Sequence, residues 1–305
     1  MQPPIRETDL PPIGGRYDVG GRRLYLHRSG AGGPVAVFLP GAGMFGLGYL
    51  NVQQQVGELT TSVLYDRGGT GWSDPVPLPR SAGEVAEELR SLLRVAELPG
   101  PYLFVAHSLG GLYARRFAQL FPAEVAALLL LDPAHEDYEA NQPEVARRAA
   151  EEWKKQPMPE LSPELIEGYR PILNEMYAAW PPDVRKALVE RHLDPTLAKT
   201  GLLEASNVDA LNDEMRGGGP IPAVPVIVYT ATGIDPTQLA FSTEEVVRAQ
   251  NEAKLVTNEA FVRSVPGAEN RVLADASHLM LHTRRPDAVL QGVRDLLGRL
   301  DSRRS

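Results

Sequence analysis

The sequence predicts an α/β fold in which helices cover both faces of a mostly parallel sheet. Short apolar runs alternate along the chain with amphipathic stretches of helical period, which is typical of parallel strands joined by crossover helices. Three of these runs, at residues 34–39, 102–106 and 125–131, are apolar throughout, as expected for strands that are buried on both faces. We therefore expect a single sheet with right-handed connections.

Eight strands are expected, and they fall at residues 15–19, 22–27, 34–39, 62–65, 102–106, 125–131, 225–230 and 271–274. Gly20 and Gly21 join the first two strands in a hairpin, because glycine readily adopts the positive φ of a tight turn. Helices are expected at residues 84–97, 109–121, 242–264 and 286–300. In the first of these helices, Val85, Leu89 and Leu92 fall on one face, which is the pattern of an amphipathic helix.

The chain divides into an arm, a core and an insertion. Residues 1–12 are polar and rich in proline, so we expect a loose N-terminal arm. Residues 136–219 are charged, rich in proline and mostly helical in pattern, with no clear strand. Because strands resume after this segment, we interpret it as an insertion into an α/β core formed by residues 13–135 and 220–305.

Composition excludes several classes of function. The 305 residues include no cysteine, which excludes thiol catalysis, disulfides and cysteine metal sites. The formal charge is -8, and no basic patch stands out, so a nucleic-acid partner is not expected. No apolar run approaches the ~20 residues of a membrane span, and the N-terminus lacks the pattern of a signal peptide. We expect a cytoplasmic protein with no membrane partner, and the sequence leaves open whether it forms a homo-oligomer.

A nucleophile elbow is predicted at residues 106–110. The apolar strand at 102–106 ends in Ala-His-Ser-Leu-Gly, which fits the pattern G-x-S-x-G except that Ala106 replaces the first glycine. Such a turn projects the serine hydroxyl into solvent, and small flanking residues let the strand and the next helix approach closely. The N-terminus of that helix favours a developing oxyanion. Ser108 is therefore the candidate nucleophile.

Two further turns have distinctive sequence patterns. Residues 40–46 form a glycine-rich loop after a buried strand, without the Gly-Lys-Ser/Thr ending of a phosphate-binding loop. Residues 66–75 read Asp-Arg-Gly-Gly-Thr-Gly-Trp-Ser-Asp-Pro, which we interpret as a compact structural turn. Together with the serine elbow, these patterns resemble the α/β-hydrolase superfamily, of the serine carboxylesterase and lactone hydrolase type. The resemblance implies the α/β-hydrolase fold with a helical cap after strand six, formed by residues 136–219.

The resemblance also implies the other catalytic groups. It places the base in the loop after the last strand, where His278 stands, and the acid after strand six or strand seven, where Asp132 and Asp235 stand. Asp132 is preferred because it directly follows an uninterrupted buried strand. The oxyanion hole would consist of the backbone N–H groups of Ala42 and Leu109. This chemistry requires no metal and no other cofactor.

The predicted reaction is the hydrolysis of an ester or lactone through an acyl-enzyme on Ser108. An apolar, medium-sized substrate is expected from the residues near the oxyanion loop, near the base and in the cap. These expected pocket residues are Gly43, Met44, Phe45, Trp153, Tyr177, Trp180 and Leu279. Three alternatives stay open: a prolyl-type aminopeptidase, given the many cap glutamates, a carbon–carbon bond hydrolase, and a non-catalytic ligand receptor of the same fold. Epoxide hydrolases and haloalkane dehalogenases are disfavoured, because they need an aspartate at the elbow.

Overall fold

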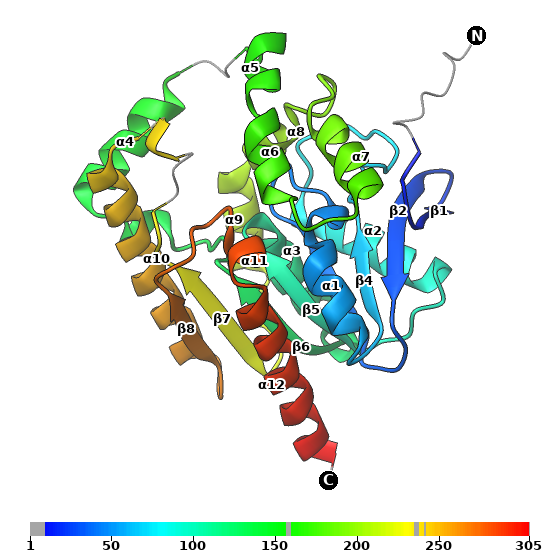
Figure 1. The fold of residues 1–305 in the computed structure, drawn as a ribbon. Coiled ribbons are helices and arrows are strands. Elements are labelled where there is room, and N and C mark those ends of the chain that lie inside the picture. The colour runs from blue at the N-terminus through cyan, green and yellow to red at the C-terminus, as the bar shows by residue number, and fades with distance from the viewer. Residues whose placement is uncertain (1–9, 157–159, 235–237, 241, 305) are drawn as a thin grey trace.

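The computed structural model describes residues 10–156, 160–234, 238–240 and 242–304. Its strands are β1 (Gly15–Asp18), β2 (Arg23–Ser29), β3 (Ala36–Leu39), β4 (Ser62–Tyr65), β5 (Tyr102–His107), β6 (Val125–Leu131), β7 (Val226–Ala231) and β8 (Glu269–Leu273). They form one sheet in the order β1-β2-β4-β3-β5-β6-β7-β8 (Figure 1). The pairings of β1 with β2 and of β2 with β4 are antiparallel, and all the others are parallel. This confirms the mostly parallel, eight-stranded sheet that the sequence predicts.

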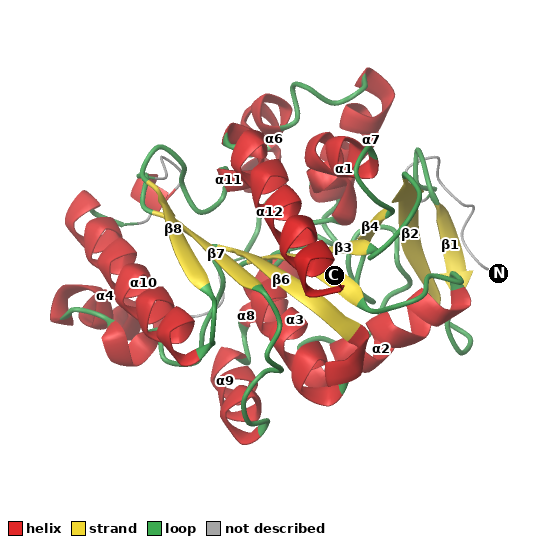
Figure 2. Cartoon of the chain, turned by 90° about the horizontal axis from the view of Figure 1, so that it is seen from below, coloured by secondary structure: helices red, strands yellow, loops and turns green. Residues whose placement is uncertain are grey.

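Helices cover both faces of the sheet (Figures 1 and 2). One face carries α1 (Leu50–Gly57) and α12 (Pro286–Arg304), and the other carries α2 (Ala82–Val95), α3 (Leu109–Leu120) and α10 (Glu244–Ser264). Short helical turns connect the elements, and they are η2 (Gly46–Tyr49), η3 (Pro122–Glu124), η5 (Gln238–Ala240) and α11 (Leu281–Arg284). Helix α1 has no counterpart among the helices that the sequence predicts.

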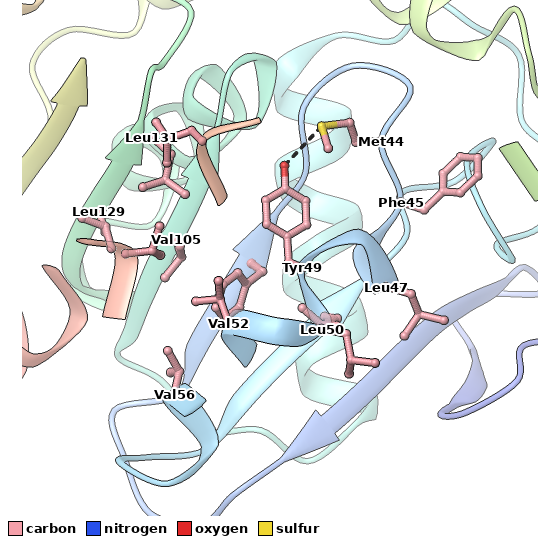
Figure 3. Packing of buried hydrophobic residues seen from close by; sticks show 14 of the residues in the cluster. Met44, Phe45, Leu47, Tyr49, Leu50, Val52, Val56, Val105, Leu129 and Leu131 are labelled. Carbon is pink, nitrogen blue, oxygen red and sulfur yellow. Dashed lines mark hydrogen bonds between the residues drawn. The ribbon is translucent and has the colours of Figure 1, made fainter. Parts of the chain in front are cut away.

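Side chains of each central strand alternate between two hydrophobic cores. On β6, Leu129 and Leu131 face the side of α1 and α12, whereas Leu128 and Leu130 face the side of α2 and α3. A strand that is apolar on both faces therefore has a core to fill on each side, which explains its continuous apolar run. Figure 3 shows the first core, where Val52 from α1 packs into the same cluster as residues of β5 and β6.

The insertion between β6 and β7 is helical in its described part. It contains η4 (Glu139–Asn141), α4 (Glu144–Lys154), α5 (Pro163–Gly168), α6 (Arg170–Met176), α7 (Pro182–His192), α8 (Thr200–Ala205) and α9 (Val208–Gly217). These helices rest on different parts of the core: α4 packs against α10, and α9 packs against α3. The group α5 to α7 lies near α1, over the end of the sheet at which β3 and β5 terminate (Figure 1).

Of the arm expected at residues 1–12, only residues 10–12 are described, and they belong to no helix or strand. No helix of the described chain is both long enough and apolar enough to cross a membrane. Within the same described ranges, no three acidic or histidine side chains gather into a group that could hold a metal ion.

Candidate active site

Ser108 lies in a sharp turn between β5 and α3. Its φ of 52° is in the left-handed region, which residues with a Cβ rarely adopt, so the backbone is strained at this point. The Ser108 N–H donates to the carbonyl of Leu131 (3.1 Å), and the Ser108 carbonyl accepts from the N–H of Ala134 (2.9 Å), so the end of β6 holds the turn. Gly110 is required by close packing, because a Cβ at this position would lie 2.2 Å from the carbonyl oxygen of Leu39.

His278 bridges Ser108 and Asp132. Its Nε2 lies 3.0 Å from Oγ of Ser108, and its Nδ1 lies 2.5 Å from Oδ2 of Asp132. Asp132 directly follows β6 with its side chain fully buried, and the N–H of Ala231 donates to its other carboxylate oxygen (3.0 Å). The structure therefore brings together three side chains that the sequence analysis selected. The alternative acid, Asp235, lies outside the described residues.

Asp132 has a second partner, which the sequence analysis missed. Lys254 on α10 donates from Nζ to Oδ2 of Asp132 (2.8 Å) and to the carbonyl oxygen of Ala231 (2.6 Å). Burial opposes the ionisation of Asp132, but the charge of Lys254, together with His278, holds the pKa of this carboxyl well below its usual value. Lys254 shares a face of α10, at spacings of three and four, with the buried residues Val247, Asn251, Asn258 and Phe261. A lysine in that register is a signal that sequence reasoning could have used, because lysine is rarely placed on a buried face without a partner.

His107, the residue before the nucleophile, supports the loop that carries His278. Its Nε2 lies 2.9 Å from the backbone carbonyl oxygen of His278, and its Nδ1 lies 2.7 Å from the hydroxyl of Tyr49. A carbonyl only accepts, so Nε2 carries the proton, and Nδ1 of the neutral ring accepts from Tyr49. Burial, with the neighbouring His278, holds the pKa of His107 well below its usual value, which keeps the ring neutral. His107 thus interacts with Tyr49 and the backbone of His278 rather than with the hydroxyl of Ser108.

The loop that follows β3 passes close to the elbow. A Cβ at Gly41 would lie 3.2 Å from Cβ of Ser108, so only a residue without a side chain allows this approach without displacement. Ala42 comes next in this loop, and Leu109 follows Ser108 at the first position of α3. Among the hydrogen bonds of the described chain, none engages the backbone N–H of Ala42 or of Leu109.

A buried ion pair holds the same loop in place. Arg67, in the turn after β4 that the sequence analysis interprets as structural, donates from Nε to Oε1 of Glu204 on α8 (2.7 Å). Arg67 also donates to the carbonyl oxygens of Pro40 (2.6 Å) and Gly41 (2.9 Å). Glu204 accepts from the N–H of Gly43 (2.8 Å), so Gly43, which was expected at the substrate pocket, is instead anchored to the insertion. The two charged side chains are 1% and 3% exposed.

A cavity of about 260 Å³ opens beside Ser108. Apart from the three residues of the hydrogen-bonded series, its lining consists of Pro133, Ala134, Tyr138, Gln238, Gln250, Asn251 and Lys254. Most of these side chains carry a polar group, and several come from α10 and from the chain just after β6. None of these seven residues is among those expected at the pocket from the sequence.

The aromatic residues expected at the pocket lie elsewhere. Trp153 is on α4, and because α4 packs against α10, this side chain points outward and is 55% exposed. Tyr177 and Trp180 are buried against each other, with ring centres 5.1 Å apart in an edge-on arrangement. The indole N–H of Trp180 donates to the carbonyl oxygen of Leu47 (2.7 Å), so these two residues attach the insertion to η2.

The remaining expected pocket residues also pack into the interior. The sulfur of Met44 lies 3.4 Å from the hydroxyl oxygen of Tyr49, as Figure 3 shows. Phe45 stacks on His192 of α7 with ring centres 4.0 Å apart. Leu279, next to His278, packs against the core on the side of α1 and α12. Their apolar character is therefore accounted for by packing between the core and the insertion.

Comparison with known proteins extends this description. A model of the "Alpha/beta hydrolase family" matches residues 36–291. "Uncharacterized protein C23C11.06c" of Schizosaccharomyces pombe is 38% identical over 86 residues, which are 28% of this chain and 16% of that protein. "Putative carbamate hydrolase RutD" of Cronobacter turicensis is 31% identical over 102 residues, 33% of this chain and 38% of that protein. The solved structure "Est816 as an N-Acyl homoserine lactone degrading enzyme" is similar with a TM-score of 0.61 at 19% identity, covering 92% of this chain and 99% of that one. The chain spans less than half the length of the curated relatives named here.

Proposed function

This chain belongs to the alpha/beta hydrolase family, and from the geometry of its site we propose that it is a serine hydrolase that cleaves a carboxylic ester or a lactone. One observation carries the proposal: the hydrogen-bonded series from Ser108 through His278 to Asp132, at 3.0 and 2.5 Å. A serine hydroxyl is a weak nucleophile unless a base accepts its proton, and the base needs a fixed acceptor on its other nitrogen. Ser108, His278 and Asp132 stand in these relations to one another.

In the proposed reaction, His278 Nε2 takes the proton of Ser108 as Oγ attacks the carbonyl carbon of the substrate. Asp132 accepts the hydrogen bond from His278 Nδ1 throughout, which keeps the ring oriented and stabilises its positive charge. His278 then gives the proton to the leaving alcohol, and the acyl group stays on Ser108. A water molecule repeats the sequence on the acyl-enzyme, which releases the acid and restores the serine.

The charge that develops on the carbonyl oxygen needs hydrogen-bond donors that are already in position. We assign this role to the backbone N–H groups of Leu109, which follows Ser108 in the chain, and of Ala42, which follows Gly41 in the loop that approaches Ser108; neither has a partner among the described hydrogen bonds. Each such donor contributes roughly 3 kcal/mol to the stabilisation of a transition state. The Arg67–Glu204 pair, which holds the loop of Ala42, supports this assignment by keeping that donor fixed.

The lining of the cavity refines the substrate class. Gln238, Gln250 and Asn251 bring side-chain amide groups to the lining, which favours a substrate with a polar substituent over the apolar ester expected from the sequence. An aminopeptidase needs an unpaired acidic side chain to hold the substrate amine. The carboxylate in the described lining, Asp132, is paired with His278 and Lys254, which disfavours this alternative.

The test is a panel of substrates that distinguishes the related chemistries. Wild type and Ser108→Ala are compared on polar and apolar 4-nitrophenyl esters, on acyl homoserine lactones, on carbamates and on proline β-naphthylamide. Lactones and carbamates enter the panel because of the likeness to the two proteins named above. We expect esters and lactones to be cleaved by wild type and not by Ser108→Ala. Equal rates for both proteins on every compound would refute the proposal and favour a ligand receptor.

A further inference from the structure

We propose that Lys254 is a positioning residue for this reaction: its ammonium group keeps Asp132 ionised and directed at His278. The inference rests on the proposed function, since it assigns Lys254 a part in the same reaction. Lys254 stands on α10, 122 residues beyond Asp132 in the chain. It belongs to none of the sequence patterns that mark the nucleophile, the base or the acid.

The geometry places Lys254 in a clamp around the carboxylate. Asp132 Oδ2 accepts from both Lys254 Nζ (2.8 Å) and His278 Nδ1 (2.5 Å), while Oδ1 accepts from the N–H of Ala231 (3.0 Å). The second donation of Lys254, to the carbonyl oxygen of Ala231 (2.6 Å), ties the ammonium group to the end of β7. Lys254 and Ala231 together therefore fix both the position and the rotation of the carboxylate.

In the resting state, the positive charge of Lys254 compensates the buried negative charge of Asp132. The side chain of Asp132 is fully buried, and a buried carboxylate is strongly disfavoured unless a partner compensates its charge. His278 is neutral before it takes the proton of Ser108, so it offers a hydrogen bond without a full positive charge. Lys254 supplies that charge throughout the cycle, and Asp132 is ionised before His278 becomes positive.

Among the described residues, few other groups near Asp132 could compensate its charge. Among the described residues, the titratable side chains that face the pair from neighbouring elements are His278, His107 and Tyr138. Burial keeps His107 neutral and raises the pKa of Tyr138 to about 12, so neither carries charge near neutral pH. The alternative role for Lys254, direct binding of an anionic substrate, is also open to a side chain that lines the cavity and is 15% exposed.

The experiment separates charge, hydrogen bonding and substrate binding. Lys254→Met removes both the charge and the donor, and Lys254→Gln keeps a donor without the charge. Arg248→Met is the control, because Arg248 is an exposed cation on the same helix whose partner, Glu244, is also exposed. The values of kcat and KM are measured against pH for a neutral ester and for an ester with a carboxylate substituent. Proton NMR follows the downfield signal of the His278 Nδ1 proton in the same variants.

For Lys254→Met we expect kcat to fall by about 10- to 100-fold on both esters, the effect of losing a hydrogen bond to a charged group. KM should change by less than about threefold, since ground-state binding is not involved. Because the substitution removes a cation beside the hydrogen-bonded pair of Asp132 and His278, the pair takes up a proton more easily, and activity should be lost on the acidic side about one pH unit higher than in wild type. The kcat of Lys254→Gln should lie between those of wild type and Lys254→Met.

Two results would overturn the inference. One is a variant with unchanged kcat, pH profile and NMR signal. The other is a rise in KM confined to the charged ester, which would make Lys254 a substrate-binding group. If wild type shows no hydrolysis that depends on Ser108, the proposed function itself has failed. The NMR signal then decides on Lys254 separately: displacement or loss in Lys254→Met supports positioning, and an unchanged signal contradicts it.

Discussion

Arg67 and Glu204 form a buried ion pair that joins the turn after β4 to α8 of the insertion. The pair makes two hydrogen bonds within itself and three with the backbone of Pro40, Gly41 and Gly43. The loop that carries the proposed oxyanion donor is therefore held from both sides, by the core and by the insertion. A rearrangement of α8 would be transmitted directly to this loop.

The ion pair between Arg67 and Glu204 predicts that one set of substitutions can restore stability without restoring activity. Glu204→Met leaves the guanidinium of Arg67 buried and unpaired, which should destabilise the protein by about 3–5 kcal/mol. The double variant Arg67→Met/Glu204→Met removes both charges and should recover most of that loss, because apolar replacements of a buried pair are often close to neutral. The kcat of the double variant should nevertheless be low, because the loop lacks the three hydrogen bonds that Arg67 and Glu204 make with its backbone. Urea unfolding and kcat on one ester measure the two effects.

The control for this pair is Glu144→Met, which breaks the exposed pair of Glu144 with Arg148 on α4. Exposed ion pairs contribute little, so both stability and kcat should stay near the wild-type values. If the double variant regains full activity together with its stability, the ion pair serves folding alone, and its influence on the oxyanion loop is refuted.

The identity of the acid leads to a second prediction. Asp132→Asn should lower kcat by about 10⁴-fold with little change in KM, because an amide cannot hold His278 in the productive tautomer. The matched variant is Asp235→Asn, which changes the aspartate that the sequence analysis kept as an alternative. We expect this variant to retain most of its activity. Inactive Asp235→Asn with active Asp132→Asn would assign the acid to the loop after β7 instead.

The comparison of sequence with structure shows which kinds of residue can be predicted. The elbow pattern after an apolar strand selected Ser108, whereas His278 and Asp132 were selected because they stand where the resembled superfamily places its base and its acid, after strands that the apolar pattern locates. Helix α1 was missed because its eight residues are too few to show a clear helical period, and three of them are consecutive glutamines. Local composition cannot resolve so short an amphipathic helix.

Residues that act across long sequence separations were not predictable in the same way. Lys254 reaches Asp132 over 122 residues, and Glu204 reaches Arg67 over 137 residues, so the first contact depends on how α10 packs beside the end of β6 and the second on how α8 packs on the turn after β4. The positions of the aromatic residues in the insertion were not predictable from the sequence either. Trp153, on α4, is 55% exposed, whereas Trp180, which lies between α6 and α7, is buried against η2. Both are tryptophans of the same charged, helical segment, so composition alone does not distinguish them.

Tyr49 provides a third prediction, on the support of the base loop. Tyr49→Phe removes the hydroxyl that donates to Nδ1 of His107 (2.7 Å) and leaves a buried acceptor unsatisfied. The expected loss is about 1–3 kcal/mol of unfolding free energy, measured by urea titration. The matched control is Tyr65→Phe, since the hydroxyl of Tyr65 is also buried but has no hydrogen-bond partner among the described residues. That change should be neutral or stabilising, and equal losses in the two variants would contradict the role of the Tyr49 hydroxyl.

Buried His282 predicts how stability depends on pH. Its side chain is fully buried and stacks on Tyr49 with ring centres 4.2 Å apart, and burial lowers its pKa to about 3. In the unfolded chain a histidine titrates near 6.5, roughly its unperturbed value. The neutral ring therefore contributes stability that is complete above this pH and is lost as the pH falls toward the folded value, at about 1.4 kcal/mol per pH unit.

The variant His282→Phe keeps a ring against Tyr49 but cannot bind a proton. Its unfolding free energy, measured in urea at intervals between about pH 6 and pH 4, should fall less steeply than that of wild type by about 1.4 kcal/mol per pH unit, the contribution of one proton. The comparison of slopes does not depend on any constant change in packing that the substitution causes, because such a change shifts all points equally. Parallel curves for the two proteins would show that His282 takes up its proton over the same pH range in the folded and the unfolded chain, and that burial does not keep the ring neutral.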